Sequence, residues 1–166
     1  MRRKSHFLWK VALTPLFIIT LSGVSYAQGS LNCPDFDQNH SVWNGLLHRN
    51  VKAGVVNYSG LKSQQNELQI YLNSLESVCP DEYNEWSRRH KMAFWINAYN
   101  AYTVKLILDN YPVRSITTIG NQPFKRRFIP LQRFKARRMS LDDIEHQILR
   151  RQFPDPRIHF ALVCAS

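Results

Sequence analysis

The feature that most constrains this 166-residue chain is a long apolar stretch that leaves a helix without a polar face. Residues 81–110 begin polar, and from Met92 to Leu108 apolar side chains recur on every side of the helix. Such a helix has to be buried, because any face that it turned to water would be apolar. Tyr111-Pro112 ends it, since a proline disfavours the helical conformation of the residue before it. The rest of the chain must therefore pack around this helix.

Helical spacing of apolar residues predicts three further helices. The first covers residues 41–53 and ends at Gly54. The second follows Ser59, which can cap it, and ends before Cys79. The third covers residues 140–151 and starts at a capping box, in which two side chains each bind a backbone N–H group at the helix start.

Strand signals are fewer. Residues 55–58 indicate a short strand or an extended linker, and residues 113–139 indicate strands and turns with prolines between them. The β-branched and aromatic run at residues 158–164 is suited to a central strand. Because helices outnumber strands and the two do not alternate along the chain, the sequence predicts an α+β domain that is rich in helix and has a small sheet.

Residues 1–27 have the organisation of a secretory signal peptide. Four basic residues precede an apolar run at residues 11–21, and small residues then lead to Ala27. The run is shorter than the roughly 20 residues that a membrane-spanning helix needs, although a permanent anchor is the alternative interpretation. We therefore expect cleavage after Ala27 and a mature chain of residues 28–166 that is exported to the periplasm or the cell exterior.

Removal of the signal peptide lowers the positive charge of the chain, and export changes which anionic partners the chain can meet. The full chain has a net charge of +10, and removal of residues 1–27 leaves 18 basic and 12 acidic residues, a net charge of +6. Much of that charge lies in one segment without an acid, where phenylalanines separate the cations Lys125, Arg126, Arg127, Arg133, Lys135, Arg137 and Arg138. In an exported protein we expect no nucleic acid partner, and a polyanion of the cell envelope is the more available one. The interpretation that the pattern favours over either partner is a solvated hairpin with its arginines outward.

The three cysteines divide into a pair and a single thiol. Cys33 and Cys79 each precede a proline and can pair in an oxidising compartment. Closing a loop of that length contributes about 4 kcal/mol in the chain-entropy model. Cys164 is then the odd thiol.

Cys164 is a candidate nucleophile, because a thiol with a nearby histidine is the minimum for cysteine catalysis. His146, at the border of the apolar face of helix 140–151, is the easier partner. His159 is closer in sequence, but in a strand it points to the opposite face from Cys164. The alternatives are a buried inert thiol and a surface histidine.

Three polar side chains are expected on apolar faces. Glu145 falls on the apolar face of its helix, so it must meet an arginine, a histidine or backbone donors, or take up a proton. Glu145 then either has a structural role, such as pairing with an arginine, or orients a neighbouring catalytic group. Asn97 and Asn100 lie three residues apart on the apolar helix, so both amides need partners. They clamp a neighbouring loop or present an amide to a substrate or an oxyanion.

The sequence lacks the usual signatures of bound cofactors. Its six histidines show no metal-ligand spacing, and no cysteine pair has the spacing of a zinc site. A phosphate-binding glycine loop, a nucleotide fingerprint and a G-x-S-x-G elbow are also absent from it. We therefore expect neither a metal nor an organic cofactor.

Five ordered motifs resemble the family catalogued as domain of unknown function 547. They are GVVNYSGL at residues 54–61, AFWINAYNA at 93–101, YPVRSI at 111–116, SLDDIEH at 140–146 and DPRIHFALVC at 155–164. The resemblance implies relatives among exported bacterial proteins and, with a leucine-zipper region, among plant proteins, and it implies no established reaction. The family pattern usually has Asp where this chain has Asn57. It also continues past the segment at Cys164, which implies that residues 28–166 are the N-terminal part of such a domain.

Two functions are consistent with these patterns. The first is a cysteine-dependent hydrolase or acyl transferase that acts on a peptide or an envelope component, with Cys164 as nucleophile and His146 as base. In it Glu145 orients the imidazole, and Asn97 or Asn100 donates to the developing oxyanion. The second is a non-catalytic exported module that binds an envelope ligand or partner, or an inactive fragment. The sequence leaves open whether the chain is an enzyme.

Overall fold

The structure is a computed structural model of the chain, and it describes residues 33–163. The predicted signal peptide, residues 1–27, lies outside the described residues, as does Cys164. Among the residues that are described, no helix is long and apolar enough to cross a membrane.

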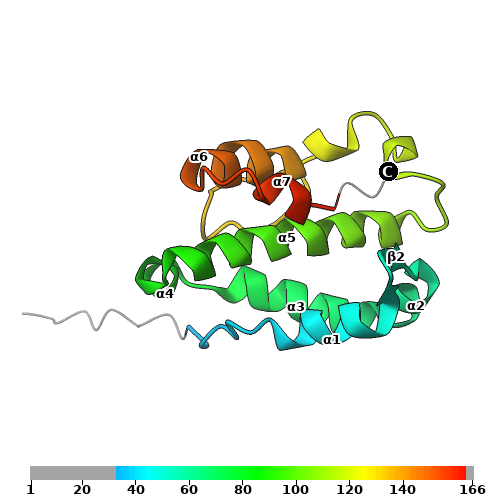
Figure 1. The fold of residues 1–166 in the computed structure, drawn as a ribbon. Helices are drawn as coiled ribbons and strands as arrows, with labels where there is room; N and C mark the ends of the chain where they lie inside the picture. Colours follow the sequence, from blue (N-terminus) through cyan, green and yellow to red (C-terminus); the bar gives the residue numbers. More distant parts are fainter. Residues whose placement is uncertain (1–32, 164–166) are drawn as a thin grey trace, which may run out of the picture. The chain divides into compact units, whose positions relative to one another are not determined.

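The long helix α5, Arg88–Asp109, lies at the centre of the domain. Ser87 caps it, because its Oγ accepts a hydrogen bond from the His90 N–H at 3.2 Å. Figure 1 shows α5 between the helices α1, Ser41–Asn50, and α3, Gln65–Ser77, on one side and the C-terminal helices on the other. Its buried residues come from every side of the helix and are Phe94, Trp95, Ala98, Tyr99, Ala101, Tyr102, Thr103, Val104, Leu106, Ile107 and Leu108. The prediction of a buried central helix is confirmed.

The small sheet follows α1. Strands β1, Val51–Lys52, and β2, Val55–Val56, pair antiparallel, with Val51 opposite Val56. The two residues between them, Ala53 and Gly54, have φ angles of 48° and 79°, which suits a two-residue hairpin turn. The predicted helix 41–53 therefore ends early, at Asn50, because the chain turns into this hairpin.

The next predicted helix is divided in two. Helix α2 covers Tyr58–Ser63, and α3 begins at Gln65. The cap is Asn57 rather than Ser59, since Asn57 Oδ1 accepts from the Gly60 N–H at 3.0 Å. An aspartate at this position would be able to cap in the same way. Helix α4, Pro80–Glu85, then leads into α5.

Residues 113–139 contain turns in place of the predicted strands. They form the short 3-10 helices η1, Ile116–Thr118, and η2, Pro123–Lys125, and one isolated bridge between Ile129 and Met139. A single bridge makes no ladder, so the strands predicted for this segment are wrong, whereas the predicted turns are present. Within residues 33–163 the sheet consists of β1 and β2, and the prediction of a helix-rich α+β domain with a small sheet is confirmed.

The predicted helix 140–151 is present, although much of it is a π-helix. Ser140 and Asp143 form the predicted capping box, with Asp143 Oδ2 3.0 Å from the Ser140 N–H and Ser140 Oγ 3.1 Å from the Asp143 N–H. The π-helix η3 covers Asp143–Leu149, and α6, Arg150–Gln152, follows it.

The predicted central strand at residues 158–164 is wrong. Residues Ile158–Ala161 form the short helix α7 after the turn at Pro156. Ile158 and Leu162 are buried, four residues apart as on a helix, whereas Phe160 between them is 87% exposed. The run is buried on one side only, and no strand of the described residues lies beside it.

The N-terminal segment docks on α3, α4 and α5. A disulfide joins Cys33 to Cys79, the pair that the sequence suggests, with 5.9 Å between the Cα atoms. The Phe36 ring meets that of Phe94 edge to face at 5.6 Å. His40 is buried and shares a 2.8 Å hydrogen bond between its Nδ1 atom and the Tyr71 hydroxyl. Burial lowers the pKa of His40, because the charged imidazolium loses its water.

This buried histidine predicts a pH dependence of stability. The pKa of His40 is lower in the folded chain than its ordinary value of 6.5, so the unfolded chain binds a proton more readily. We expect the free energy of unfolding to be at its full value above pH 6.5 and to fall as the pH decreases through the folded-state pKa. The measurement is urea unfolding between pH 7.5 and pH 5. His40→Gln should flatten the profile, while His48→Gln, at an exposed position of α1, should keep it. A flat profile in the unmutated protein contradicts this account.

Candidate functional site

Asn100 holds the C-terminal segment against α5. Its Nδ2 atom donates to the Ala161 carbonyl at 2.9 Å, and its Oδ1 atom accepts from the Val163 N–H at 2.9 Å. One side chain thus binds a donor and an acceptor of the same backbone segment, as a neighbouring strand would. This is the loop clamp that the sequence offered as one alternative. The clamped residues lead directly into Cys164.

Asn97 has a different environment from Asn100, although it lies only one turn away on α5. Its side chain is partly exposed and forms no hydrogen bond within residues 33–163. Within residues 33–163 the expected protein partner is thus found for Asn100 but not for Asn97, whose part of α5 is only partly covered there.

Glu145 pairs with an arginine of its own helical segment. Its side chain is 15% exposed, and Oε1 accepts from Arg150 Nε at 3.1 Å and from Nη2 at 2.7 Å. The two residues are five apart, a spacing that a π-helix brings to one side more closely than an α-helix does. The carboxylate thus has the structural pairing that the sequence offered as one alternative, and it does not bind His146.

The proposed catalytic pair is incomplete in the part of the chain that the structure describes. His146 is exposed and has no hydrogen bond or ion pair to another described residue. Cys164, its proposed partner, lies outside the described residues. His159, on α7, is also exposed and meets the ring of Phe160 at 5.7 Å. The dyad of Cys164 and His146 remains a prediction.

Two shallow pockets flank α7. The first has a volume of about 220 Å³ and includes Phe153, His159 and Leu162 in its lining. The second has a volume of about 310 Å³ and is lined by Met92 and Ile96 of α5 together with residues of the 155–161 segment. Both pockets therefore lie next to the segment that Asn100 holds. Within residues 33–163, no group of three or more His, Cys, Asp or Glu side chains could bind a metal ion.

Asp143 is a nearly buried carboxylate that the sequence analysis did not identify as a candidate site residue. Its side chain is 11% exposed and accepts from Arg127 Nη1 at 2.7 Å and from Lys135 Nζ at 3.4 Å. Burial favours its neutral form, but the hydrogen bonds from Ser140 and the charges of Lys135 and Arg127 outweigh burial and hold the pKa of Asp143 below its usual range. The capping box indicated its place at a helix start, whereas no sequence pattern indicated its two cations.

The basic segment, residues 125–138, is anchored by four of its seven cations. Besides the two that bind Asp143, Arg133 Nη1 lies 2.6 Å from Cys79 Sγ, and Arg138 Nη1 donates to the Phe128 carbonyl at 3.0 Å. These four side chains are thus bonded to other groups of the domain, although Arg127, Arg133 and Arg138 stay exposed to solvent. The remaining three cations are exposed and unpaired within the described chain, and they are Lys125, Arg126 and Arg137.

Comparison with known proteins places the chain in a family without a known activity. The model of the family described as "Protein of unknown function, DUF547" matches residues 83–166, about half of the chain, and the chain belongs to this family. The matched region includes α5 with Asn97 and Asn100 and the η3 helix with Glu145 and His146. Neither the curated proteins nor the solved structures contained a match.

If Asn100 holds the C-terminal segment, its removal should speed up hydrogen exchange at the backbone amide that it binds. Asn100→Ala removes the acceptor of the Val163 N–H. Loss of one hydrogen bond costs about 1 kcal/mol, which corresponds to roughly fivefold faster local opening. We expect the Val163 amide to exchange with deuterium faster by about that factor in this variant, as measured by NMR. Asn97→Ala, on the same helix, is the matched control and should leave that rate unchanged. Equal rates in the two variants would contradict the clamp.

Proposed function

We propose that this protein is an exported module that binds an anionic polymer of the cell envelope through the basic segment. The proposal depends on the observation that the cations of this segment fall into a bonded group and an exposed group. Four of them attach the segment to the domain, and the exposed Lys125, Arg126 and Arg137 remain without partners in the described chain. Cations on an anchored segment lose less conformational entropy on binding than cations on a free tail.

Export is supported by two independent features. Residues 1–27 combine basic, apolar and small residues in the order of a signal peptide. The disulfide between Cys33 and Cys79 belongs to the kind of bond that persists in oxidising compartments and is rare in the cytosol. An exported basic protein meets anionic polymers of the envelope before it meets nucleic acid.

The charge balance of the segment favours an anionic ligand. Its seven cations face one bonded carboxylate, that of Asp143, so the segment keeps a large positive excess. Binding of such a segment to a polyanion releases condensed counterions, which makes the affinity fall steeply as salt rises. A small or uncharged ligand would not show this dependence.

A charge-matched comparison tests the proposal. The triple variant Lys125→Gln, Arg126→Gln, Arg137→Gln should bind dextran sulfate, a model polyanion, at least about tenfold more weakly at low salt and with a shallower salt dependence. The control removes three exposed cations elsewhere, by Lys52→Gln, Arg89→Gln and Arg114→Gln, and changes the net charge equally. Isothermal titration calorimetry at several salt concentrations measures both. Equal losses in the two variants would show that net charge alone matters and would contradict the proposed surface.

A second candidate function is a cysteine-dependent hydrolase or acyl transferase. The Asn100 clamp favours it, because the clamp fixes residues 161–163, which lie beside two pockets and directly precede Cys164 in the sequence. In this function Cys164 attacks the substrate carbonyl, His146 accepts the thiol proton, and Asn97 donates to the oxyanion. Glu145 orients the imidazole only if it leaves Arg150.

The reactivity of the thiol tests this second candidate. If His146 activates Cys164, iodoacetamide at neutral pH should alkylate Cys164 about tenfold faster than it alkylates glutathione. His146→Gln should remove that advantage, and His48→Gln is the control that should keep it. Peptide mass mapping measures the rates. Alkylation no faster than that of glutathione would exclude an activated nucleophile.

A further inference from the structure

The two sulfurs of the disulfide have unequal environments. Cys79, between α3 and α4, is 3% exposed, whereas Cys33 on the N-terminal segment is partly exposed. A thiolate that approaches from solvent therefore has better access to the Cys33 side of the bond than to the Cys79 side. Attack on the Cys33 sulfur makes Cys79 the leaving group.

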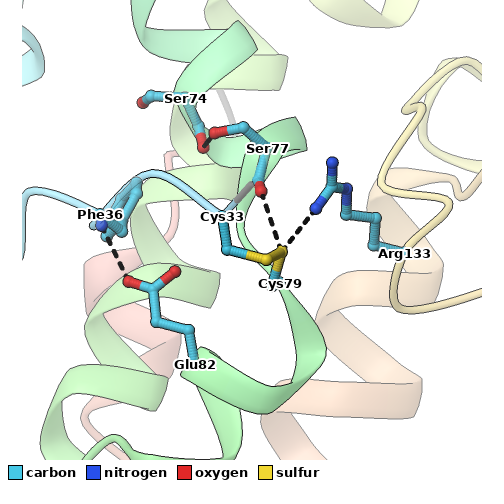
Figure 2. Close-up of a disulfide and its surroundings, with 7 residues drawn as sticks. All are labelled: Cys33, Phe36, Ser74, Ser77, Cys79, Glu82 and Arg133. Atoms are coloured by element: carbon cyan, nitrogen blue, oxygen red, sulfur yellow. Dashed lines mark hydrogen bonds between the residues drawn. A yellow bond between two sulfur atoms is a disulfide. The ribbon is translucent and has the colours of Figure 1, made fainter. Parts of the chain in front are cut away.

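The leaving group has a cation beside it. Arg133 Nη1 lies 2.6 Å from Cys79 Sγ, and Figure 2 shows the guanidinium directed at this sulfur. Arg133 forms no ion pair with any carboxylate of residues 33–163, so its charge is not neutralised by a partner there. A neighbouring guanidinium stabilises a thiolate, and a more stable thiolate leaves faster in disulfide exchange.

The other polar groups around the bond do not compete for Arg133. Glu82 of α4 points toward Phe36, whose N–H it accepts at 2.8 Å, on the opposite side of the disulfide from Arg133 (Figure 2). Its second oxygen is buried without a partner in the described chain. The Ser77 carbonyl lies 3.9 Å from Cys79 Sγ, further away than the guanidinium.

We propose that Cys33 is a site of reversible mixed-disulfide formation with an external thiol, and that Cys79 is its leaving group, held as a thiolate by Arg133. The external thiol loses its proton to water, and its thiolate attacks Cys33 Sγ. A new S–S bond forms to Cys33, the Cys33–Cys79 bond breaks, and its electron pair remains on Cys79 Sγ. In the reverse step the Cys79 thiolate attacks Cys33 Sγ and expels the external thiolate, so oxidation states balance in both directions.

The exchange has a structural consequence. The disulfide ties the N-terminal segment to the junction of α3 and α4, next to a cation of the basic segment. In the mixed disulfide the segment keeps the ring contact of Phe36 with Phe94 and the bond of His40 to Tyr71 but loses its covalent tie. Arg133 meanwhile pairs with a full negative charge instead of a neutral sulfur. The site thus couples the thiol state of the surroundings to the anchoring of this segment.

Mapping of the adduct tests which sulfur is attacked. Cys164 is first blocked with N-ethylmaleimide, and the protein is then incubated at neutral pH with reduced glutathione or with a thioredoxin that lacks its second active-site cysteine. After alkylation with iodoacetamide, peptide mass mapping should find the added thiol on Cys33 and the alkyl group on Cys79. An adduct with glutathione identifies a small thiol as the partner, and one with thioredoxin identifies a protein dithiol. An adduct on Cys79, or none with either probe, overturns the proposal.

A rate comparison tests the role of Arg133. Arg133→Gln should slow mixed-disulfide formation by about threefold or more, because the leaving thiolate loses its cation. Arg133→Lys should restore part of the rate, and Arg114→Gln, which removes an exposed cation outside the basic segment, should leave it unchanged. Loosening of the fold would expose the bond and raise the rate, so a decrease identifies the electrostatic effect. A rate in Arg133→Gln equal to or above that of the unmutated protein overturns the role.

Discussion

Burial of the α5 helix is the constraint on which the rest of the structure depends. Its apolar surface needs covering over most of its length, and the coverage comes from segments far apart in the sequence. The Phe94 ring shows this best, since it packs against Phe36 of the N-terminal segment, Trp86 before α5 and Phe134 of the basic segment. Edge-to-face and tilted contacts of this kind add to the free energy gained by removing the rings from water. The aromatic cluster thereby joins three parts of the chain that have no regular secondary structure of their own.

Polar contacts then decide how the irregular segments are held. Asp143 binds two cations of the basic segment, Arg133 reaches the disulfide, and Asn100 binds the backbone on either side of Leu162. Each contact satisfies backbone or charged groups that a turn-rich segment would otherwise leave without partners. The same contacts, with that of Arg138, engage four cations of the segment, whereas the other three are exposed. The segment is therefore anchored by some of its cations, and the exposed ones are those of the proposed binding surface.

The sequence predicted several residues of the candidate site, but it did not predict the hydrogen bonds and ion pairs that these residues form. The helix around Asn100 and the resemblance to family motifs pointed to this region, and the need of a buried amide for partners follows from elementary physical chemistry. Helical-wheel reasoning placed Glu145 on the apolar face, but a π-helix changes the angle between successive residues and brings Arg150 to it. The strand expected at residues 158–164 failed because β-branched and aromatic residues also suit a short helix when no neighbouring strand is available.

By itself the sequence determined the buried central helix, the helix-rich α+β class, the capping box at Ser140 and a cysteine pair able to bond. These features depend on residues close together or on the solvation of one face, both of which can be read along the chain. Only the tertiary structure decided which arginine pairs with Asp143, which amide clamps a backbone and which sulfur of the disulfide lies beside a cation. Those outcomes join residues that are from 16 to 63 positions apart. Local spacing carries no information on such pairs, because packing around α5 brings them together.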